Sequence, residues 1–129
     1  MTLDTSALVA VLFSEPGHLD LVDCMLEAET LRIGAPSLVE VSVVFAGRTG
    51  RATGAEMQTL LDELGVTVVP FGEDEWRRAV DAFTRYGRGR HKAALNFGDC
   101  LAYATAAAAR DSLLFVGDDF RLTDIEPAL

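Results

Sequence analysis

Gly65-Val66-Thr67-Val68-Val69-Pro70 is the clearest strand in this 129-residue chain. Valine and threonine fill the space between a glycine and a proline, which is typical of a β-strand. A helix is predicted before it, opened by a capping-box pattern of Thr53 and Glu56 and closed after Leu64. A second helical pattern, residues 74–86, follows it. A strand between two helices indicates an α/β fold.

Short apolar runs and helical patterns alternate along the rest of the chain. Strands are predicted at about 1–4, 31–34 and 113–116, and helices at about 5–13, 18–29, 36–47 and 96–110. This order indicates a sheet of mostly parallel strands, and the length indicates a single domain, residues 1–129. In the helix at 74–86, Trp76, Phe83 and Tyr86 are expected to form a stripe that faces the core.

The composition is that of a folded, core-rich protein. Hydrophobic residues make up 50% of the chain, and no apolar run reaches the roughly 18 residues that a membrane span needs. The first residues lack the positive charge of a signal peptide. A cytoplasmic location without membrane association is therefore expected.

Basic residues gather in one segment of an acidic chain. The net charge is −9, from 20 acidic and 11 basic residues, which taken alone argues against contact with nucleic acid. Five residues nevertheless crowd together in what we call the basic segment: Arg85, Arg88, Arg90, His91 and Lys92. We expect this segment to contact phosphate groups, with a solvated loop as the alternative. His91 fits a basic surface better than the role of a general base.

Acidic residues fall at or near the ends of predicted elements. Asp4 ends the first strand, Asp118 and Asp119 follow the last one, and Glu40 and Asp99 lie in the first turns of helices. In parallel sheets, ligands bind beyond the carboxyl ends of the strands, which is where these acids would meet. Carboxylates in apolar surroundings need a partner, and several together offer the oxygen ligands that a hard divalent cation prefers. This pattern predicts metal-dependent hydrolysis of a phosphodiester.

The first two acids also have ordinary structural explanations. Asp4 could cap the first helix, but Thr5 and Ser6 can cap it equally well, so Asp4 is expected to be spare for the site. Ser6 could help to hold a carboxylate or a metal-bound water. Ser37 and Glu40 match the capping box, in which the glutamate bonds an amide at the start of the helix.

The acids later in the chain have similar alternatives. Asp99 could cap the alanine-rich helix that follows it. If that helix begins earlier, Asn96 and Asp99 lie one turn apart and could address the same ion. Asp118 and Asp119 could form a turn after the last strand, with at least one of them facing the site, while Phe120 plugs the core.

Four stretches in this order resemble a PIN domain, and more narrowly the VapC-type toxins of bacterial toxin–antitoxin pairs, in particular those of mycobacteria and other actinobacteria. They are Leu3-Asp4-Thr5-Ser6-Ala7-Leu8, Glu40 early on a helix, Leu95-Asn96-Phe97-Gly98-Asp99-Cys100, and Leu113-Leu114-Phe115-Val116-Gly117-Asp118-Asp119-Phe120. The resemblance covers essentially the whole chain. It implies a three-layer α/β/α sandwich and an endoribonuclease that depends on Mg²⁺ or Mn²⁺ and cleaves structured RNA, such as tRNA or ribosomal RNA. It also implies a VapB-type antitoxin as partner and a homodimer.

The resemblance extends to individual residues. Asp4, Glu40 and Asp99 match the three metal-binding acids of the family. The polar positions of the first and third family motifs correspond to Thr5 or Ser6, and to Asn96. The basic segment, which precedes Asp99, would meet the RNA backbone.

The chain departs from the family at the fourth acid. Many PIN domains place it three residues before the phenylalanine, where Gly117 stands here. Asp118 or Asp119 would then substitute for it. The departure leaves open a second function, a PIN-like module that binds RNA or protein without cutting. A phosphatase of the haloacid-dehalogenase type, with Asp4 as nucleophile, would need a second aspartate where Ser6 stands.

Overall fold

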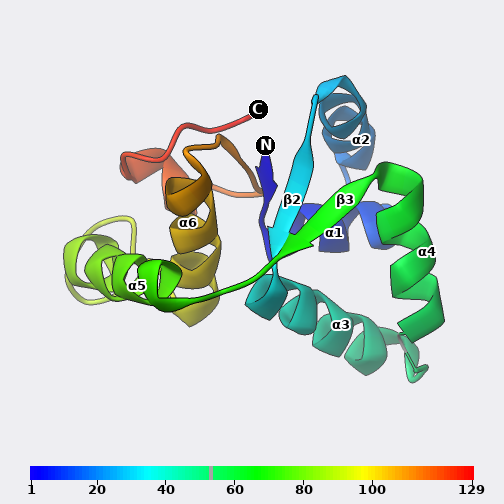
Figure 1. The fold of residues 1–129 in the computed structure, drawn as a ribbon, viewed down its shortest axis with the longest axis horizontal. Coiled ribbons are helices and arrows are strands. Elements are labelled where there is room, and N and C mark those ends of the chain that lie inside the picture. Colours follow the sequence, from blue (N-terminus) through cyan, green and yellow to red (C-terminus); the bar gives the residue numbers. More distant parts are fainter. Residues whose placement is uncertain (53) are drawn as a thin grey trace.

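The computed structural model describes residues 1–52 and 54–129. Thr53, half of the predicted capping box, lies outside the described residues. The elements are β1 (Thr2–Leu3), α1 (Thr5–Leu12), α2 (His18–Glu27), β2 (Leu31–Gly34), α3 (Ala35–Thr49), α4 (Gly54–Leu64), β3 (Val66–Val69), α5 (Glu73–Tyr86), α6 (Phe97–Ala109), β4 (Leu113–Leu114) and the 3₁₀ helix η1 (Asp119–Leu122). The order of the strands, with two helices between each strand and the next, is as predicted (Figure 1).

The strands form one parallel sheet in the order β3-β2-β1-β4. β1 lies between β2 and β4, with Thr2 opposite both Arg32 and Leu113. Successive residues of a strand point to opposite faces. Leu113 and Leu114 accordingly enter two different hydrophobic clusters, one on each side of the sheet.

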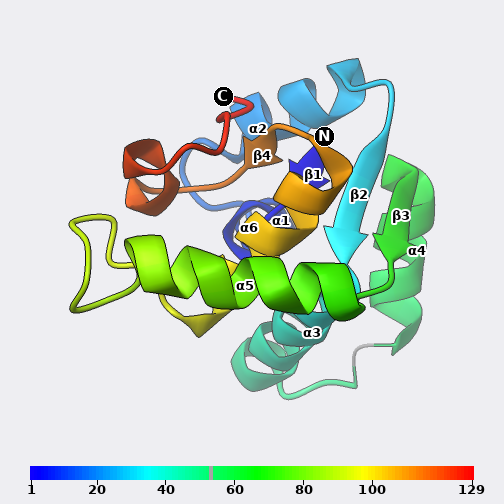
Figure 2. The same cartoon turned by 60° about the vertical axis from the view of Figure 1, so that its left-hand side comes forward.

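Helices cover both faces of the sheet. One cluster joins the sheet to α1–α4 through residues such as Leu8, Ile33 and Val41. The other joins it to α5, α6 and the segment after β4 through residues such as Cys100 and Phe120. Figures 1 and 2 show α5 and α6 on one side of the sheet and α1, α2 and α4 on the other. The predicted α/β/α architecture with a parallel sheet is therefore confirmed.

Most element boundaries differ from the predicted ones by one or two residues, and two of these differences have a clear structural reason. β4 ends at Leu114 rather than Val116, because its neighbour β1 gives way there to α1. The amide of Asp4 makes the last backbone–backbone bond between the two segments in the described residues, to the carbonyl of Leu114 (2.9 Å). α3 extends two residues beyond its predicted end and stops before Gly50, whose φ of +68° suits a glycine at a helix end.

α5 contacts the core through a small residue. Ala82 is fully buried against α6, whereas Trp76 is 56% and Phe83 42% exposed. The predicted core stripe is wrong for these two aromatic residues, because α5 lies on the outside of α6 and meets it with one face only (Figure 2). Tyr86 is half-buried, with its ring centre 6.0 Å from that of Tyr103. None of the described helices combines the length and the apolar character of a membrane span.

Candidate active site

A hollow of about 350 Å³ opens at the carboxyl edge of the sheet, and we call it the acidic hollow. Four of the predicted acids line it, each from a different part of the fold: Asp4, Glu40, Asp99 and Asp119. The predicted supporting residues line it as well: Thr5, Ser6 and Asn96. The remaining lining residues are Val9, Glu15, Val44, Arg48, Gly98 and Val116. The fold therefore brings together acids that lie far apart in the sequence.

Asp4 caps α1 and is almost fully buried, with 6% of its surface exposed. Its Oδ2 accepts hydrogen bonds from the amide (2.9 Å) and the hydroxyl of Ser6. The prediction that Asp4 would be spare is wrong, because Thr5 is already the first residue of the helix and cannot cap it. Among the described residues these bonds engage Oδ2 alone, so capping leaves Oδ1 for the hollow.

Two hydroxyl groups fix the first two acids relative to neighbouring elements. Ser6 Oγ donates to Asp4 and accepts from the amide of Val116 (2.9 Å), which ties the segment after β4 to the start of α1. Thr5 Oγ1 donates to Glu40 Oε2 (2.8 Å), which ties α1 to α3. The supporting residues thus set the spacing of the acids.

Glu40 does not form the capping box that the sequence suggested. The N-cap of α3 is Gly34, so Ser37 lies inside the helix, and its buried hydroxyl has no hydrogen-bond partner among the described residues. Glu40 reaches Thr5 instead, as well as the start of α6. A Cβ on Gly98 would lie 2.8 Å from Glu40 Oε2, so only glycine lets this carboxylate come so close.

Asn96 and Asp99 cap each other at the start of α6. Asn96 Oδ1 accepts from the amide of Asp99 (3.0 Å), and Asp99 Oδ2 accepts from the amide of Asn96 (2.7 Å). Asn96, not Asp99, is the N-cap residue. The reciprocal cap holds the Asp99 carboxylate at the helix start, where it lines the acidic hollow.

The carboxylates of the acidic hollow repel one another. Burial raises the pKa of Asp4 despite hydrogen bonds that lower it, and the charge of Glu40 adds to the rise. Burial also raises the pKa of Asp99 to about 6, helped by the other acids of the hollow, Asp4, Asp119 and Glu40, and opposed by its bond to the Asn96 amide. Raised pKa values mean that negative charge here lacks compensation. The hollow is short of positive charge.

Asp119 rather than Asp118 reaches the hollow. The Asp118 side chain is 94% exposed and lies 3.4 Å from Arg121. Gly117 has a φ of +100°, a conformation that would strain an aspartate at this position. Glycine therefore makes the turn, and Phe120, 2% exposed as predicted, anchors η1 in the core beside Asp119.

The donors of the hollow suit a hard divalent cation. Its acids offer carboxylate oxygens, and its polar residues add hydroxyl and amide oxygens. In the described residues, 1–52 and 54–129, no group of three or more His, Cys, Asp or Glu side chains is close enough to hold a metal ion. The donor chemistry fits, while the acids stand further apart than ligands of one ion. Mutual repulsion, which a cation would relieve, favours such a separation.

Sequence analysis missed two charged residues of the hollow, Glu15 and Arg48. Arg48 Nη1 lies 2.6 Å from Glu15 Oε1. Spacing could have found Arg48, because Glu40, Val44 and Arg48 follow one another at intervals of four along one face of α3. Glu15 lies between α1 and α2 and carries no comparable signal.

The basic segment does not contribute to the lining of the hollow as the structure describes it. Four of its residues are exposed in the connection between α5 and α6: Arg88, Arg90, His91 and Lys92. The Arg90 guanidinium lies 5.5 Å from the ring centre of Phe83, and His91 Nδ1 accepts from the amide of Ala93 (3.1 Å). Their proposed contact with phosphate would therefore lie outside the hollow.

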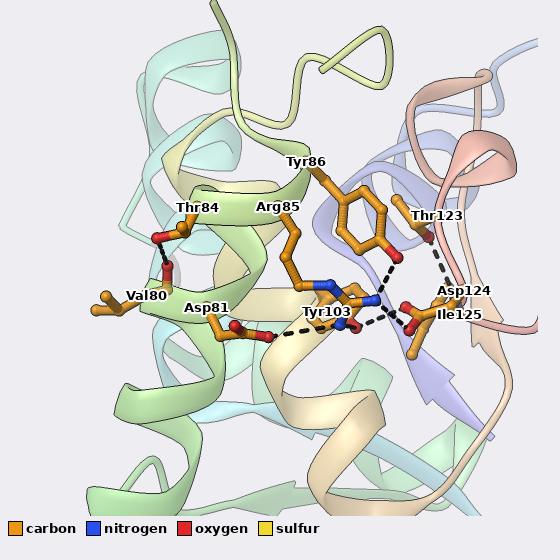
Figure 3. A network of polar contacts seen from close by, with 9 residues as sticks. All are labelled: Val80, Asp81, Thr84, Arg85, Tyr86, Tyr103, Thr123, Asp124 and Ile125. Carbon is orange, nitrogen blue, oxygen red and sulfur yellow. Dashed lines mark hydrogen bonds and ion pairs between the residues drawn. The ribbon is translucent and has the colours of Figure 1, made fainter. Parts of the chain in front are cut away.

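Arg85 is engaged within the protein. Figure 3 shows its guanidinium between Asp81 and Asp124, with Tyr86 and Tyr103 beside it. Arg85 Nη2 and the Tyr103 hydroxyl donate to the two oxygens of Asp124, each over 2.7 Å. Burial opposes the charge of Asp124, but these bonds hold its pKa below the ordinary value. The network fastens the C-terminal segment to α5 and α6.

Comparisons with known proteins find relatives along the whole chain. The PIN domain family model matches residues 1–126. The chain is similar to VapC ribonuclease Mb2004c of Mycobacterium bovis and to ribonuclease VapC36 of Mycobacterium tuberculosis. Each is 42% identical over 127 residues, which cover 98% of this chain and 91% of the relative. Ribonuclease VapC of Mycolicibacterium smegmatis is 39% identical over 125 residues, 97% of either chain.

Two solved structures share the fold. A toxin–antitoxin complex from Klebsiella pneumoniae matches with a TM-score of 0.71 and 20% identity, over 99% of this chain and 97% of the other. Mycobacterium tuberculosis VapC20, a sarcin–ricin loop cleaving toxin, matches with a TM-score of 0.71 and 16% identity, over 98% of each chain. At these identities the likeness concerns the fold alone.

Proposed function

This chain belongs to the PIN-domain family, among the VapC ribonucleases, and from that premise we propose that it is a metal-dependent endoribonuclease toxin that cleaves structured RNA, either tRNA or ribosomal RNA. One observation carries the proposal: four of the predicted acids, from four parts of the fold, line one hollow, and the pKa values of Asp4 and Asp99 are raised. Strongly perturbed acids that gather in a hollow are typical of a catalytic site. A single domain, residues 1–129, would perform this function, since both hydrophobic clusters share one sheet.

The acids of the hollow would hold Mg²⁺, or Mn²⁺ in its place, and act as the catalytic residues: Asp4, Glu40, Asp99 and Asp119. When bound, such a cation lowers the pKa of a water molecule and offsets negative charge on the phosphate. Thr5, Ser6 and Asn96 would orient the carboxylates through the hydrogen bonds that they make to them. Asp118, exposed beside Arg121, would take no part.

The exposed part of the basic segment would bind the RNA backbone away from the scissile bond. Arg88, Arg90 and Lys92 supply the charge, and His91 lies among them. Arg85 differs from these residues, because its ion pairs with Asp81 and Asp124 already use its charge. We assign it to the stability of the fold.

A VapB-type antitoxin is the proposed protein partner. The VapC names of the relatives support it, as does the fold that the chain shares with part of a toxin–antitoxin complex. The antitoxin would restrain cleavage until it is removed. Since tRNA and ribosomal RNA are cytoplasmic, the enzyme would act in the cytoplasm.

Exposed apolar residues on α3 and α5 support a homodimer. Val39 and Val43 are 63% and 65% exposed, and Trp76 and Val80 are 56% and 57% exposed. Trp76 and Val80 lie one turn apart on α5, so a second α5 packed against this face would bury both. Light scattering should give the mass of a dimer for the wild type and of a monomer for Val80→Glu. A monomeric wild type would contradict this assembly.

Cleavage of total cellular RNA by the purified protein tests the proposed function. We expect discrete fragments with Mg²⁺ or Mn²⁺, and none with EDTA or with Asp99→Asn. If folded, antitoxin-free wild type gives no fragments in the presence of metal, the catalytic proposal is wrong. The PIN-like module that binds without cutting would then be favoured.

A further inference from the structure

We propose that Arg48 binds a phosphate group of the RNA substrate at the rim of the acidic hollow, and that Glu15 holds it there. The inference rests on the proposed function, since it needs an RNA substrate. Arg48 lies outside the basic segment. Its contact with a phosphate would hold the RNA at the acidic hollow, whereas the basic segment would hold it elsewhere on the surface.

Arg48 is the single basic residue among the described residues that line the acidic hollow. It shares one face of α3 with Glu40 and Val44, which line the same hollow. The acids of the hollow repel an approaching phosphate, whereas the positive charge of Arg48 attracts it. The phosphate would therefore gain a favourable contact on the side of the hollow that Arg48 forms.

The Arg48 guanidinium is held in place but still accessible. Its Nη1 donates to Glu15 Oε1 (2.6 Å), its carbon lies 4.7 Å from the ring centre of Phe13, and 48% of its side chain is exposed. An arginine offers five N–H donors in a fork that matches phosphate oxygens, and the bond to Glu15 uses one end of that fork. A side chain that is ordered before binding loses less entropy when it binds.

An ordinary surface ion pair is the alternative, and the chain contains one for comparison. Arg51 pairs with Glu56, and its side chain is 65% exposed. Neither Arg51 nor Glu56 lines the acidic hollow. Arg51 lies three positions after Arg48 and carries the same charge in the same kind of pair. The two arginines differ in their position relative to the hollow, which makes Arg51 the matched control.

RNA binding by variants in an Asp99→Asn background, which blocks cleavage, tests the inference. The probe is labelled total cellular RNA, bound on filters over a range of NaCl concentrations. Arg48→Ala should weaken binding about tenfold at physiological salt, as expected for the loss of a charge-assisted contact. It should also flatten the slope of log K against log salt by about 0.7 to 0.9, the values for one phosphate of a single strand and of a duplex. Arg51→Ala should change neither quantity.

A double variant separates contact from repulsion. Arg48→Ala leaves the Glu15 charge unpaired, and that charge alone could repel RNA. Arg48→Ala with Glu15→Gln should therefore still bind weakly, and thermal unfolding shows that each variant is folded. Recovery of parental affinity in the double variant, or equal effects of Arg48→Ala and Arg51→Ala, would overturn the inference and leave the proposed function intact. A parent that binds no RNA and a wild type that cuts none would overturn both.

Discussion

Each edge of the sheet has a partly buried aspartate, but the surroundings shift the pKa of the two aspartates in opposite directions. At the amino edge, Asp111 accepts hydrogen bonds from Arg32 and from the Thr2 hydroxyl (3.1 Å), and the Met1 amino group lies 3.4 Å away. Burial opposes the charge of Asp111, but these partners hold its pKa below the ordinary value. At the carboxyl edge, Asp99 meets other carboxylates, and its pKa rises to about 6.

The difference shows what each edge contributes. Paired with Arg32, Asp111 joins β2 to the segment before β4, so its charge stabilises the fold. The charge of Asp99 destabilises the fold, and such groups persist where a ligand or a reaction uses them. Replacing one aspartate at each edge by asparagine should therefore have different consequences for catalysis, stability and pH dependence.

The largest difference is expected in catalysis. Asp99→Asn should slow RNA cleavage at least about 100-fold, because it removes a carboxylate of the proposed ion site. Asp111→Asn makes the same chemical change at the other edge and should keep the rate within about threefold while the protein is folded. Initial rates on total cellular RNA in Mg²⁺, well below the unfolding temperature, measure both. Comparable losses in the two variants would remove the distinction between the edges.

Stability without metal should change in opposite directions. Asp111→Asn leaves Arg32 without a charged partner and should lower the free energy of unfolding by about 2 kcal/mol. Asp99→Asn removes a repelled charge while its amide oxygen can still cap α6. After allowance for the partial exposure of Asp99, it should raise the free energy of unfolding by roughly 1 kcal/mol. Urea unfolding in EDTA at neutral pH measures both, and a loss of stability in Asp99→Asn would be the contrary result.

The pH dependence of stability gives the smallest effect. Asp99 has a raised pKa, so its favourable contribution is complete below the ordinary value of 3.8 and is lost as the pH rises through about 6. Asp111 has a lowered pKa, so its contribution is present above 3.8 and is lost as the pH falls. The stability of Asp99→Asn relative to the wild type should thus increase between about pH 4 and pH 6. The stability that Asp111→Asn has lost relative to the wild type should become smaller in acid. The measurement is the urea midpoint of the three proteins across this pH range. If the midpoints of all three change with pH in the same way, this prediction is wrong.

Local patterns explain why the order of elements and the acids could be predicted. Short apolar runs define the strands, and Asp4 and Asp119, which follow β1 and β4, fall at the carboxyl edge. The choice between Asp118 and Asp119 could not be predicted, because it depends on how Phe120 packs and on the positive φ of Gly117. Sequence spacing gives neither.

Long-range partners account for the other differences. Arg85 meets Asp124 across 39 residues, and Arg48 meets Glu15 across 33. Both pairs depend on how helices and loops pack, and no local pattern contains that information. The capping role of Asp4 is local by contrast, since its bond from the amide of Ser6 follows from the point at which β1 ends. Phosphate binding by the exposed basic segment stays a prediction.

Thermal unfolding with and without Mg²⁺ tests most directly the central claim, that Asp99 in the acidic hollow lacks the positively charged partners that Asp111 has. A cation that binds the folded state raises the Tm. From EDTA to excess Mg²⁺, the wild type and Asp111→Asn should show the same rise in Tm, because their hollows carry the same acids. Asp99→Asn should show little or no rise. An unchanged wild-type Tm, or an equal rise in all three proteins, would contradict the account.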